Sequence, residues 1–551
     1  MPNINPATEI TLQSLAKEFI DAFTAFHPVD ATNIGIHQFD DRLSHYSTEE
    51  VTTYVKTLQN ILSKAEQIKP EPLPIDEQID RELLIANLKM ELFQFEKLNH
   101  WQQNPNFYVD ECIQGIYLLL LRDFAPLSVR AKNIAKRFAE VPRVLDEASQ
   151  NIKNPSRTHT IAAIEELKTG ETFFDQTTKE LSKKIPELKQ ELLAGVKPAI
   201  KAMRSYQGKL KKLLPFLKAD FAIGKDNFDY MLKTEHFLLF DSDSLLRIGE
   251  DALAKADFAI NALRNRKQDY EMTHPKPEKP ELIPPKDFSK PDILAYEASE
   301  IDSMKEWVSS HGIATVPDYL GKLVVVETPI FLRPILPGLA MRPAAIIDSV
   351  QTSYLYIPPI PDRLDAEAKN YYYNVIKYRQ WKGGVVHEGY PGHHFQLSLA
   401  NHQPSLIRKL QWNTTIIEGW ALYCEQMVAD QRLYPDDLFS DLRWLGGEKF
   451  RAARIILDVK LQTGKMTFDE AVNFLVDNFG PDTAYYQAEV RRYCLTPTQP
   501  MSYLVGKRQI LELRDEYRKK MGNKYSLKDF HDKLLAEGSI PINLIQKKLL
   551  N

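Results

Sequence analysis

Apolar residues recur at intervals of three and four along most of the first half of the chain, among lysines and glutamates and with few glycines. This spacing places apolar side chains on one face of a helix and therefore predicts amphipathic α-helices. The predicted helices span 12–26, 48–67, 75–98, 127–138, 160–181 and 185–214. Because sustained heptads are lacking, a coiled coil is not expected.

The pattern changes at 274–291, where six prolines stand among several lysines. Such a stretch is typical of a surface loop or a linker, so we expect a helical lobe at 1–273 and a second lobe at 292–551. The second lobe holds short β-branched or aromatic runs at 323–327, 344–347 and 352–357. These runs predict a small sheet. The expected fold is therefore mainly α-helical with a small β-sheet.

Composition narrows the class of protein. A chain of 551 residues with 43% hydrophobic content can bury one large core or two lobes. Its formal net charge of −4 gives no electrostatic reason to bind nucleic acid or an anionic membrane. The segment 1–6 has neither a basic region nor an apolar run, which predicts a cytoplasmic protein without a membrane partner. The sequence does not indicate an oligomeric state.

The side chains that could bind a metal or transfer protons are concentrated in the run HEGYPGHH at 387–394 and in Glu418, which opens a second apolar-periodic segment. Zinc binds imidazole and carboxylate ligands in a tetrahedral set, and a catalytic zinc keeps one position for water. We expect His387, one later histidine and Glu418 to hold zinc. Glu388 is then left as the base that takes a proton from water. The alternative is that the histidines are satisfied polar residues on a kinked helix.

The spacing of the histidines requires a break in the helix. On a regular helix His393 lies roughly 240° around the axis from His387, on the wrong side, and His394 lies about 10 Å along it. Pro391 removes a backbone donor, and its neighbouring glycines tolerate unusual backbone angles. We therefore expect a break at 389–392 that brings His393 onto the metal, with His394 as the alternative ligand.

Glu425 lies seven residues after Glu418 and so on the same helix face. It is either a partner of a metal ligand or a solvated residue.

The runs HEGYPGHHFQ at 387–396 and EGWALY at 418–423 resemble the signatures of the bacterial family called domain of unknown function 885. Weaker similarities lie within 31–42, 228–236 and 489–506, so the resemblance covers almost the whole chain. It implies a helical zinc-metallopeptidase fold of the gluzincin type with a deep cleft. The chain departs from the family pattern after Arg454, where lysine and Gln462 replace an expected glycine and histidine.

Hydrolysis of an amide builds up negative charge on an oxygen, and a phenol or guanidinium opposite the metal stabilises it. Tyr503, Tyr493 and Arg492 are the candidates, because they lie in the closing segment that resembles the family. The alternative is that both tyrosines are core residues.

Together these features predict a zinc-dependent metallohydrolase, a peptidase that acts on short or unfolded peptides. Two other functions stay open: a zinc hydrolase of a non-peptide amide or ester, and a binding protein that keeps the fold without turnover.

Overall fold

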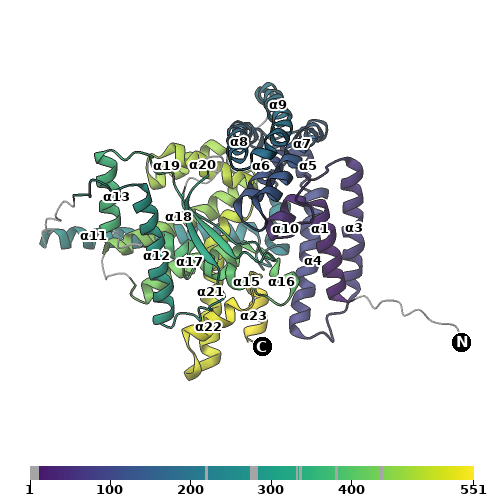
Figure 1. Ribbon diagram of the computed structural model, residues 1–551. Helices are drawn as coiled ribbons and strands as arrows, with labels where there is room; N and C mark the ends of the chain where they lie inside the picture. Colours follow the sequence, from purple (N-terminus) through teal and green to yellow (C-terminus); the bar gives the residue numbers. More distant parts are fainter. Residues whose placement is uncertain are drawn as a thin grey trace. The chain divides into compact units, whose positions relative to one another are not determined.

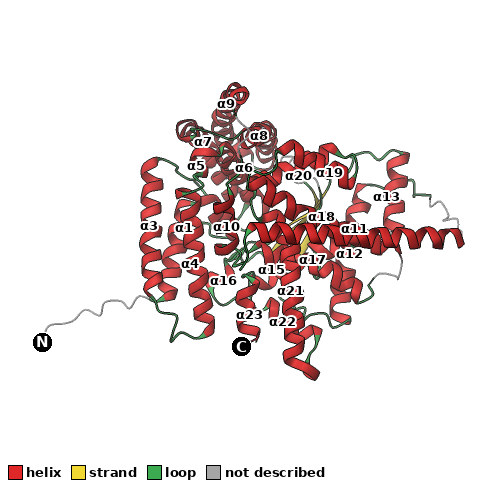
Figure 2. Cartoon of the chain, turned by 180° about the vertical axis from the view of Figure 1, so that it is seen from behind, coloured by secondary structure: helices red, strands yellow, loops and turns green. Residues whose placement is uncertain are grey.

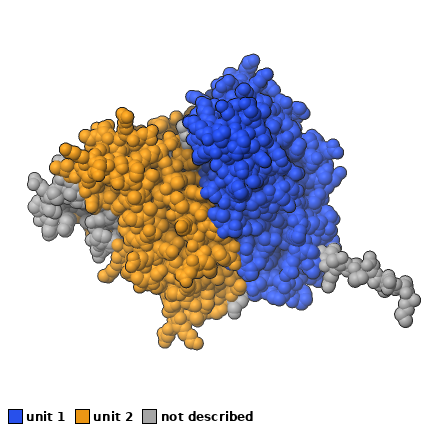
Figure 3. Space-filling model, in the orientation of Figure 1, with its two compact units in different colours: residues 1–221, 345–350, 403–411 blue, residues 222–344, 351–402, 412–551 orange. Residues whose placement is uncertain are grey.

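A computed structural model of the chain describes residues 11–217, 221–273, 283–329, 333, 338–378, 382–433 and 438–550. The fold is mainly helical with one three-stranded sheet among these residues, as the sequence predicts (Figure 1). The helices dominate the view from behind as well (Figure 2). The chain divides into two compact units (Figure 3).

Unit 1 comprises residues 1–221, 345–350 and 403–411. Its helices are α1 (Leu12–Phe26), α2 (Pro28–Ile34), α3 (Thr48–Gln67), α4 (Ile75–Glu96), α5 (His100–Gln103), α6 (Pro105–Leu121), α7 (Leu127–Asn151), α8 (Arg157–Lys184), α9 (Lys189–Leu213) and α16 (Leu406–Lys409). Most bounds agree with the predicted ranges, and α1 begins at a capping box formed by Thr11 and Ser14. The predicted end at Phe138 is wrong, because α7 continues through Pro142 to Asn151.

Unit 2 comprises residues 222–344, 351–402 and 412–551. Its helices are α10 (Lys225–Thr234), α11 (Ser242–Thr273), α12 (Lys290–Ser310), α13 (Ala366–Tyr378), α14 (Gly383–Glu388), α15 (His393–Ala400), α17 (Thr414–Asp430), α18 (Leu438–Gln462), α19 (Phe468–Phe479), α20 (Thr483–Leu495), α21 (Gln499–Met521), α22 (Leu527–Leu535) and α23 (Ile542–Leu550). Helix α11 thus belongs to unit 2. The predicted lobe boundary at 274–291 stays a prediction, since residues 274–282 lie outside the described part of the chain.

The sheet of unit 2 has the strand order β1-β3-β2, in which β1 (Lys322–Glu327) pairs parallel with β3 (Thr352–Ile357). The edge strand β2 (Ala340–Arg342) pairs antiparallel with β3, with Met341 opposite Leu355. The strand predicted at 344–347 is wrong. Residues 345–350 belong instead to unit 1, where the backbone N–H of Ile347 donates to the carbonyl of Ile34.

Helices α17 and α21 cross with their backbones in contact. A Cβ added to Gly506 would lie 1.8 Å from the carbonyl oxygen of Thr415, and one added to Gly419 would lie 2.5 Å from the α-carbon of Gly506. Only glycine at 419 and 506 therefore permits this crossing. The crossing places Glu418 on α17 close to the first turn of α21.

Among the described residues, no helix is both long and apolar enough to cross a membrane.

Candidate metal centre

The histidine helix is broken where the sequence predicts. α14 ends at Glu388, α15 begins at His393, and the four residues between them are not helical. Gly392 is required by a close approach of the chain, because an added Cβ would lie 1.9 Å from the carbonyl oxygen of His387. The indole N–H of Trp420 donates to the carbonyl of Pro391 over 2.7 Å and ties the break to α17.

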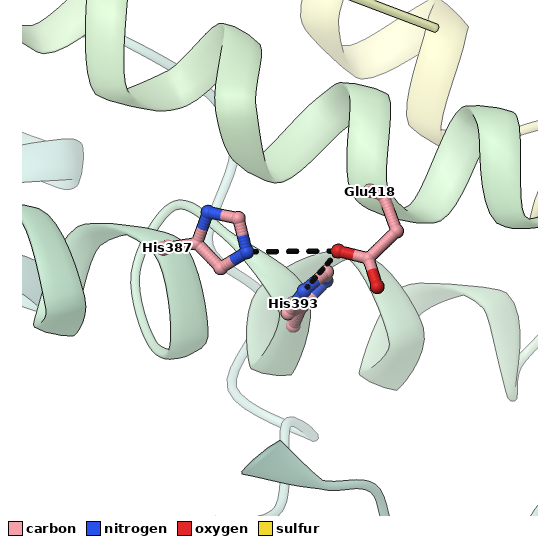
Figure 4. Close-up of side chains that lie close together, drawn as sticks. All are labelled: His387, His393 and Glu418. Atoms are coloured by element: carbon pink, nitrogen blue, oxygen red, sulfur yellow. Dashed lines mark ion pairs between the residues drawn. The ribbon is translucent and has the colours of Figure 1, made fainter. Parts of the chain in front are cut away.

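The break brings His393 beside His387, with their ring centroids 4.7 Å apart. Oε2 of Glu418 lies 3.2 Å from Nε2 of His393 and 3.6 Å from Nε2 of His387 (Figure 4). One donor atom from each of the three residues lies within 4.8 Å of the others. The structure thus brings together the three residues expected as ligands. His394 is turned away, and its Nδ1 lies 3.1 Å from Oγ of Ser353.

The donor set fits a tetrahedral ion. Two atoms bound at about 2 Å to one such ion lie roughly 3.3 Å apart, close to both distances from Glu418. Nδ1 of His387 is 2.8 Å from Oε1 of Glu425, so a neutral ring donates there and turns a lone pair at Nε2 toward Glu418. Oε2 of Glu418 is buried without a hydrogen-bond donor. These facing acceptors require a cation, either a proton or a metal ion, between them.

The electrostatics of the centre agree with this need. Burial opposes a charge on His387, but the nearby carboxylates of Glu418 and Glu425 prevail and raise its pKa to about 10. Burial also opposes the charge on Glu418, yet His393 and His387 hold the pKa of that carboxyl well below its usual range. A metal ion bound between these residues would therefore displace a proton from His387. Glu425 is buried and bonded to His387, so it is not a solvated residue.

Glu388 lines the same cavity as the three residues. Burial raises the pKa of its carboxyl, against the opposing effect of the two nearby histidines, and the backbone N–H of Met341 on β2 binds it. Glu388 can therefore hold a proton that it accepts more readily than an ordinary carboxylate can.

The other candidate residues lie on α20 and α21. Tyr503 lines the cavity, and its ring is stacked at 16° to that of His387 with centroids 6.3 Å apart. Burial, followed by the charge of Glu418, raises the pKa of Tyr503, so it stays a neutral phenol. Arg492 lines the cavity as well. Tyr493 is fully buried, and its hydroxyl donates to Glu489 over 2.7 Å.

Sequence reasoning did not assign a role to Gln499 or Glu489. The amide of Gln499 donates to Oε1 of Glu418 and to the hydroxyl of Tyr503, each over 3.1 Å, and its carbonyl accepts from Arg492 over 2.8 Å. Two signals pointed to these residues: they lie in the segment 489–506 that resembles the family, and they have helical spacing. Glu489 lies three and four residues before Arg492 and Tyr493, and Gln499 four before Tyr503, so each group shares a helix face.

Asp458 and Asn413 position these helices. The carboxylate of Asp458 accepts from the backbone N–H groups of Thr498 and Met501, which fixes the first turn of α21. Asn413 caps α17, and its amide donates to the carbonyl of Glu235 over 2.8 Å. Gln462, which stands where the resemblance led us to expect a histidine, is fully buried and donates to the carbonyl of Tyr493, away from the cavity lining.

Comparison with known proteins identifies the family. Residues 28–549 match the family described as "Bacterial protein of unknown function (DUF885)", and the chain belongs to this family. No curated protein matches the chain.

Two solved structures share the fold. A "putative lipoprotein of unknown function" from Shewanella oneidensis is 22% identical with a TM-score of 0.78, over 98% of this chain and 100% of that one. A "putative lipoprotein" from Colwellia psychrerythraea is 20% identical with a TM-score of 0.79, over 98% of this chain and 99% of that one. Lipoproteins are exported and held at a membrane by their lipid. These descriptions contradict the cytoplasmic location expected from the sequence.

Proposed function

We propose that the chain is a zinc-dependent hydrolase of the gluzincin type that cleaves peptide bonds. The observation that carries this proposal is the pair of imidazole Nε2 atoms that face Oε2 of Glu418 at 3.2 and 3.6 Å, with Glu388 in the same cavity. Zinc, when bound by His387, His393 and Glu418, would supply a Lewis acid that lowers the pKa of water and polarises a carbonyl.

The chain's own residues would perform the proton transfers. Glu388 would take a proton from the attacking water and deliver it to the leaving amine, a role that its raised pKa supports. The hydroxyl of Tyr503 accepts from Gln499, so its own proton is available to the oxygen that becomes negative. Tyr503 is favoured over Tyr493, whose hydroxyl already donates to Glu489.

The shape of the cavity supports a short or unfolded peptide as the substrate. Its volume is about 300 Å³, at the lower end of the usual range for ligand sites. Residues 338–341 form part of its wall, and β2 is the edge strand of the sheet. An extended peptide can add to such an edge through main-chain hydrogen bonds, which a folded protein does not offer.

The test is cleavage of a pool of synthetic peptides, followed by mass spectrometry. We expect new peptide ends with zinc-loaded wild-type protein, their loss on chelation and their return with added zinc. Glu388→Gln should abolish cleavage, whereas Glu512→Gln, at an exposed glutamate of α21, should not. Failure of zinc-loaded protein to cleave any peptide would refute the peptidase. Turnover of esters or other amides would then indicate a different hydrolase, and no turnover at all a binding protein.

We also infer from the descriptions of the two similar structures that the chain is exported or anchored to a membrane. Fractionation of cells that produce the native protein tests this inference. Recovery of the protein in the cytoplasmic fraction alone would refute it.

A further inference from the structure

Beside the metal centre, two arginines share one carboxylate. Nη2 of Arg454 on α18 and Nη2 of Arg492 on α20 lie 2.9 and 3.0 Å from the same oxygen, Oε2 of Glu489. The hydroxyl of Tyr493 donates to this oxygen too. Both arginines and Glu489 line the cavity that holds Glu388 and Glu418. The arginines are thus held in place and face the space that a substrate would fill.

The charges of this cluster do not cancel. Both guanidinium groups stay protonated, because arginine is not deprotonated in proteins. Burial opposes the charge on Glu489, but Arg492 and Arg454 lower its pKa to about 2, so it stays an anion. The cluster therefore carries one net positive charge in a mostly buried place. Nε of Arg454 donates to the hydroxyl of Tyr493 over 3.0 Å, and its Cζ lies 5.0 Å from the ring centroid of Phe450 and 4.6 Å from that of Tyr503.

Excess buried charge is costly unless an opposite charge accompanies it. The carboxylate of Glu418 faces His387 and His393, so it does not supply that charge. A ligand that brings its own carboxylate would complete the cluster. Guanidinium groups bind carboxylates through paired hydrogen bonds of matching geometry.

The distance from these arginines to the metal ligands matches the length of a short stretch of extended peptide. Cζ of Arg454 is 4.6 Å from the Tyr503 ring centroid, which is 6.3 Å from that of His387. The guanidinium is therefore at most about 11 Å from the His387 ring, a span of roughly three extended residues. A carboxylate within a few residues of the scissile bond can reach it.

We propose that Arg454 and Arg492 form a substrate-binding subsite for a carboxylate, so that the enzyme prefers peptides with a negative charge close to the scissile bond. This proposal rests on the proposed function and names its substrate class. The carboxylate has two possible sources, the C-terminus of a short peptide or an aspartate or glutamate side chain. The first source would make the enzyme a C-terminal exopeptidase.

The test measures binding without turnover, by calorimetry on the zinc-loaded full chain carrying Glu388→Gln. The probes are acetyl-trialanine with a free C-terminus, its C-terminal amide, and the amide of acetyl-Ala-Asp-Ala. We expect the free acid to bind about tenfold or more tightly than the amide, since a hydrogen-bonded charge is lost. Equal binding of all three probes, or no binding of any of them, would overturn the subsite. Tight binding of the aspartyl amide would assign recognition to a side chain.

Variants test whether Arg454 and Arg492 cause the preference for the free acid over the amide. Arg454→Gln and Arg492→Gln, each made separately in the same background, should reduce the acid-to-amide ratio toward one. Arg518→Gln, at an exposed arginine of α21, is the matched control and should leave the ratio unchanged. A ratio that survives both cavity variants would overturn the assignment. Zinc content is measured in every sample. Absence of zinc would count against the proposed function, whereas bound zinc with no preference for either carboxylate probe over the trialanine amide would count against the subsite alone.

Discussion

The side-chain amide of Gln499 donates a hydrogen bond of 3.1 Å to Oε1 of Glu418. This bond leaves Oε2 as the carboxylate oxygen that faces the two histidines, and Arg492 fixes the orientation of the amide by donating to its carbonyl. Gln499 is therefore expected to position a metal ligand without touching the metal.

Gln499→Leu should weaken zinc binding by about 10- to 100-fold, because Glu418 loses the bond that directs it. Competition with a chromophoric chelator measures the affinity. Gln509→Leu is the control, since this glutamine lies on the same helix and bonds to Asn543 instead. Equal affinities in the two variants would show that Gln499 does not position Glu418.

The two adjacent histidines should differ in their effect on zinc. His393→Ala should remove most bound zinc, because its Nε2 faces Glu418, whereas His394→Ala should retain it, because that ring faces Ser353. Metal analysis of both proteins after dialysis gives the answer. Loss of zinc in the His394 variant with retention in the His393 variant would reverse the ligand assignment.

The crossing of α17 and α21 should tolerate no side chain at Gly506. Gly506→Ala should lower the free energy of unfolding by about 3 kcal/mol or more, because the new Cβ would overlap the Thr415 carbonyl. Gly446→Ala is a helical control in the same unit with nothing within 4 Å of its added Cβ, and it should raise stability by about 0.5–1 kcal/mol. Urea unfolding measures both, and similar midpoints would contradict the close crossing.

Acid should destabilise unit 2 through His531. Its Nδ1 is 2.8 Å from the carbonyl of Ile313 and its Nε2 2.8 Å from the hydroxyl of Tyr423, an arrangement that holds the ring neutral. Burial lowers its pKa from 6.5 to about 4. The unfolded chain therefore takes up the proton first, and stability present above pH 6.5 is lost as the pH falls toward 4, by about 3 kcal/mol in all.

His531→Phe removes this titration. The variant should be less stable than wild type at pH 7, because Tyr423 and Ile313 lose their partner, but its stability should fall less between pH 6.5 and pH 4. Urea unfolding across this range gives both slopes, and parallel slopes would rule out His531 as a source of acid sensitivity.

The broken helix was predictable because its cause is local. Pro391 disrupts a regular helix, Gly389 and Gly392 tolerate unusual backbone angles, and the histidine spacing requires a break. The strand expected at 344–347 failed for the opposite reason. Ala344 and Ile347 have strand-like neighbours in sequence, but residues 345–350 find their partners in unit 1, and the strand forms at 340–342.

Tertiary contacts also explain the other differences between the sequence predictions and the structure. α7 runs through Pro142 because Val141, Val144 and Leu145 beside it are buried in the core of unit 1, which offsets the lost backbone hydrogen bond. The cluster of Arg454, Glu489 and Gln499 joins three helices, α18, α20 and α21, through hydrogen bonds from one helix to another. Spacing indicates which residues share a helix face, but not which faces meet.

The central claim is that His387, His393 and Glu418 hold a zinc ion while Glu388 stays free for proton transfer. Calorimetric titration of zinc into metal-free wild type, Glu388→Gln and Glu418→Gln tests it most directly. The account predicts one zinc ion per chain, with similar affinity, in the wild type and in Glu388→Gln, and much weaker binding in Glu418→Gln. No zinc binding by the wild type, or loss of binding in Glu388→Gln with retention in Glu418→Gln, would contradict it.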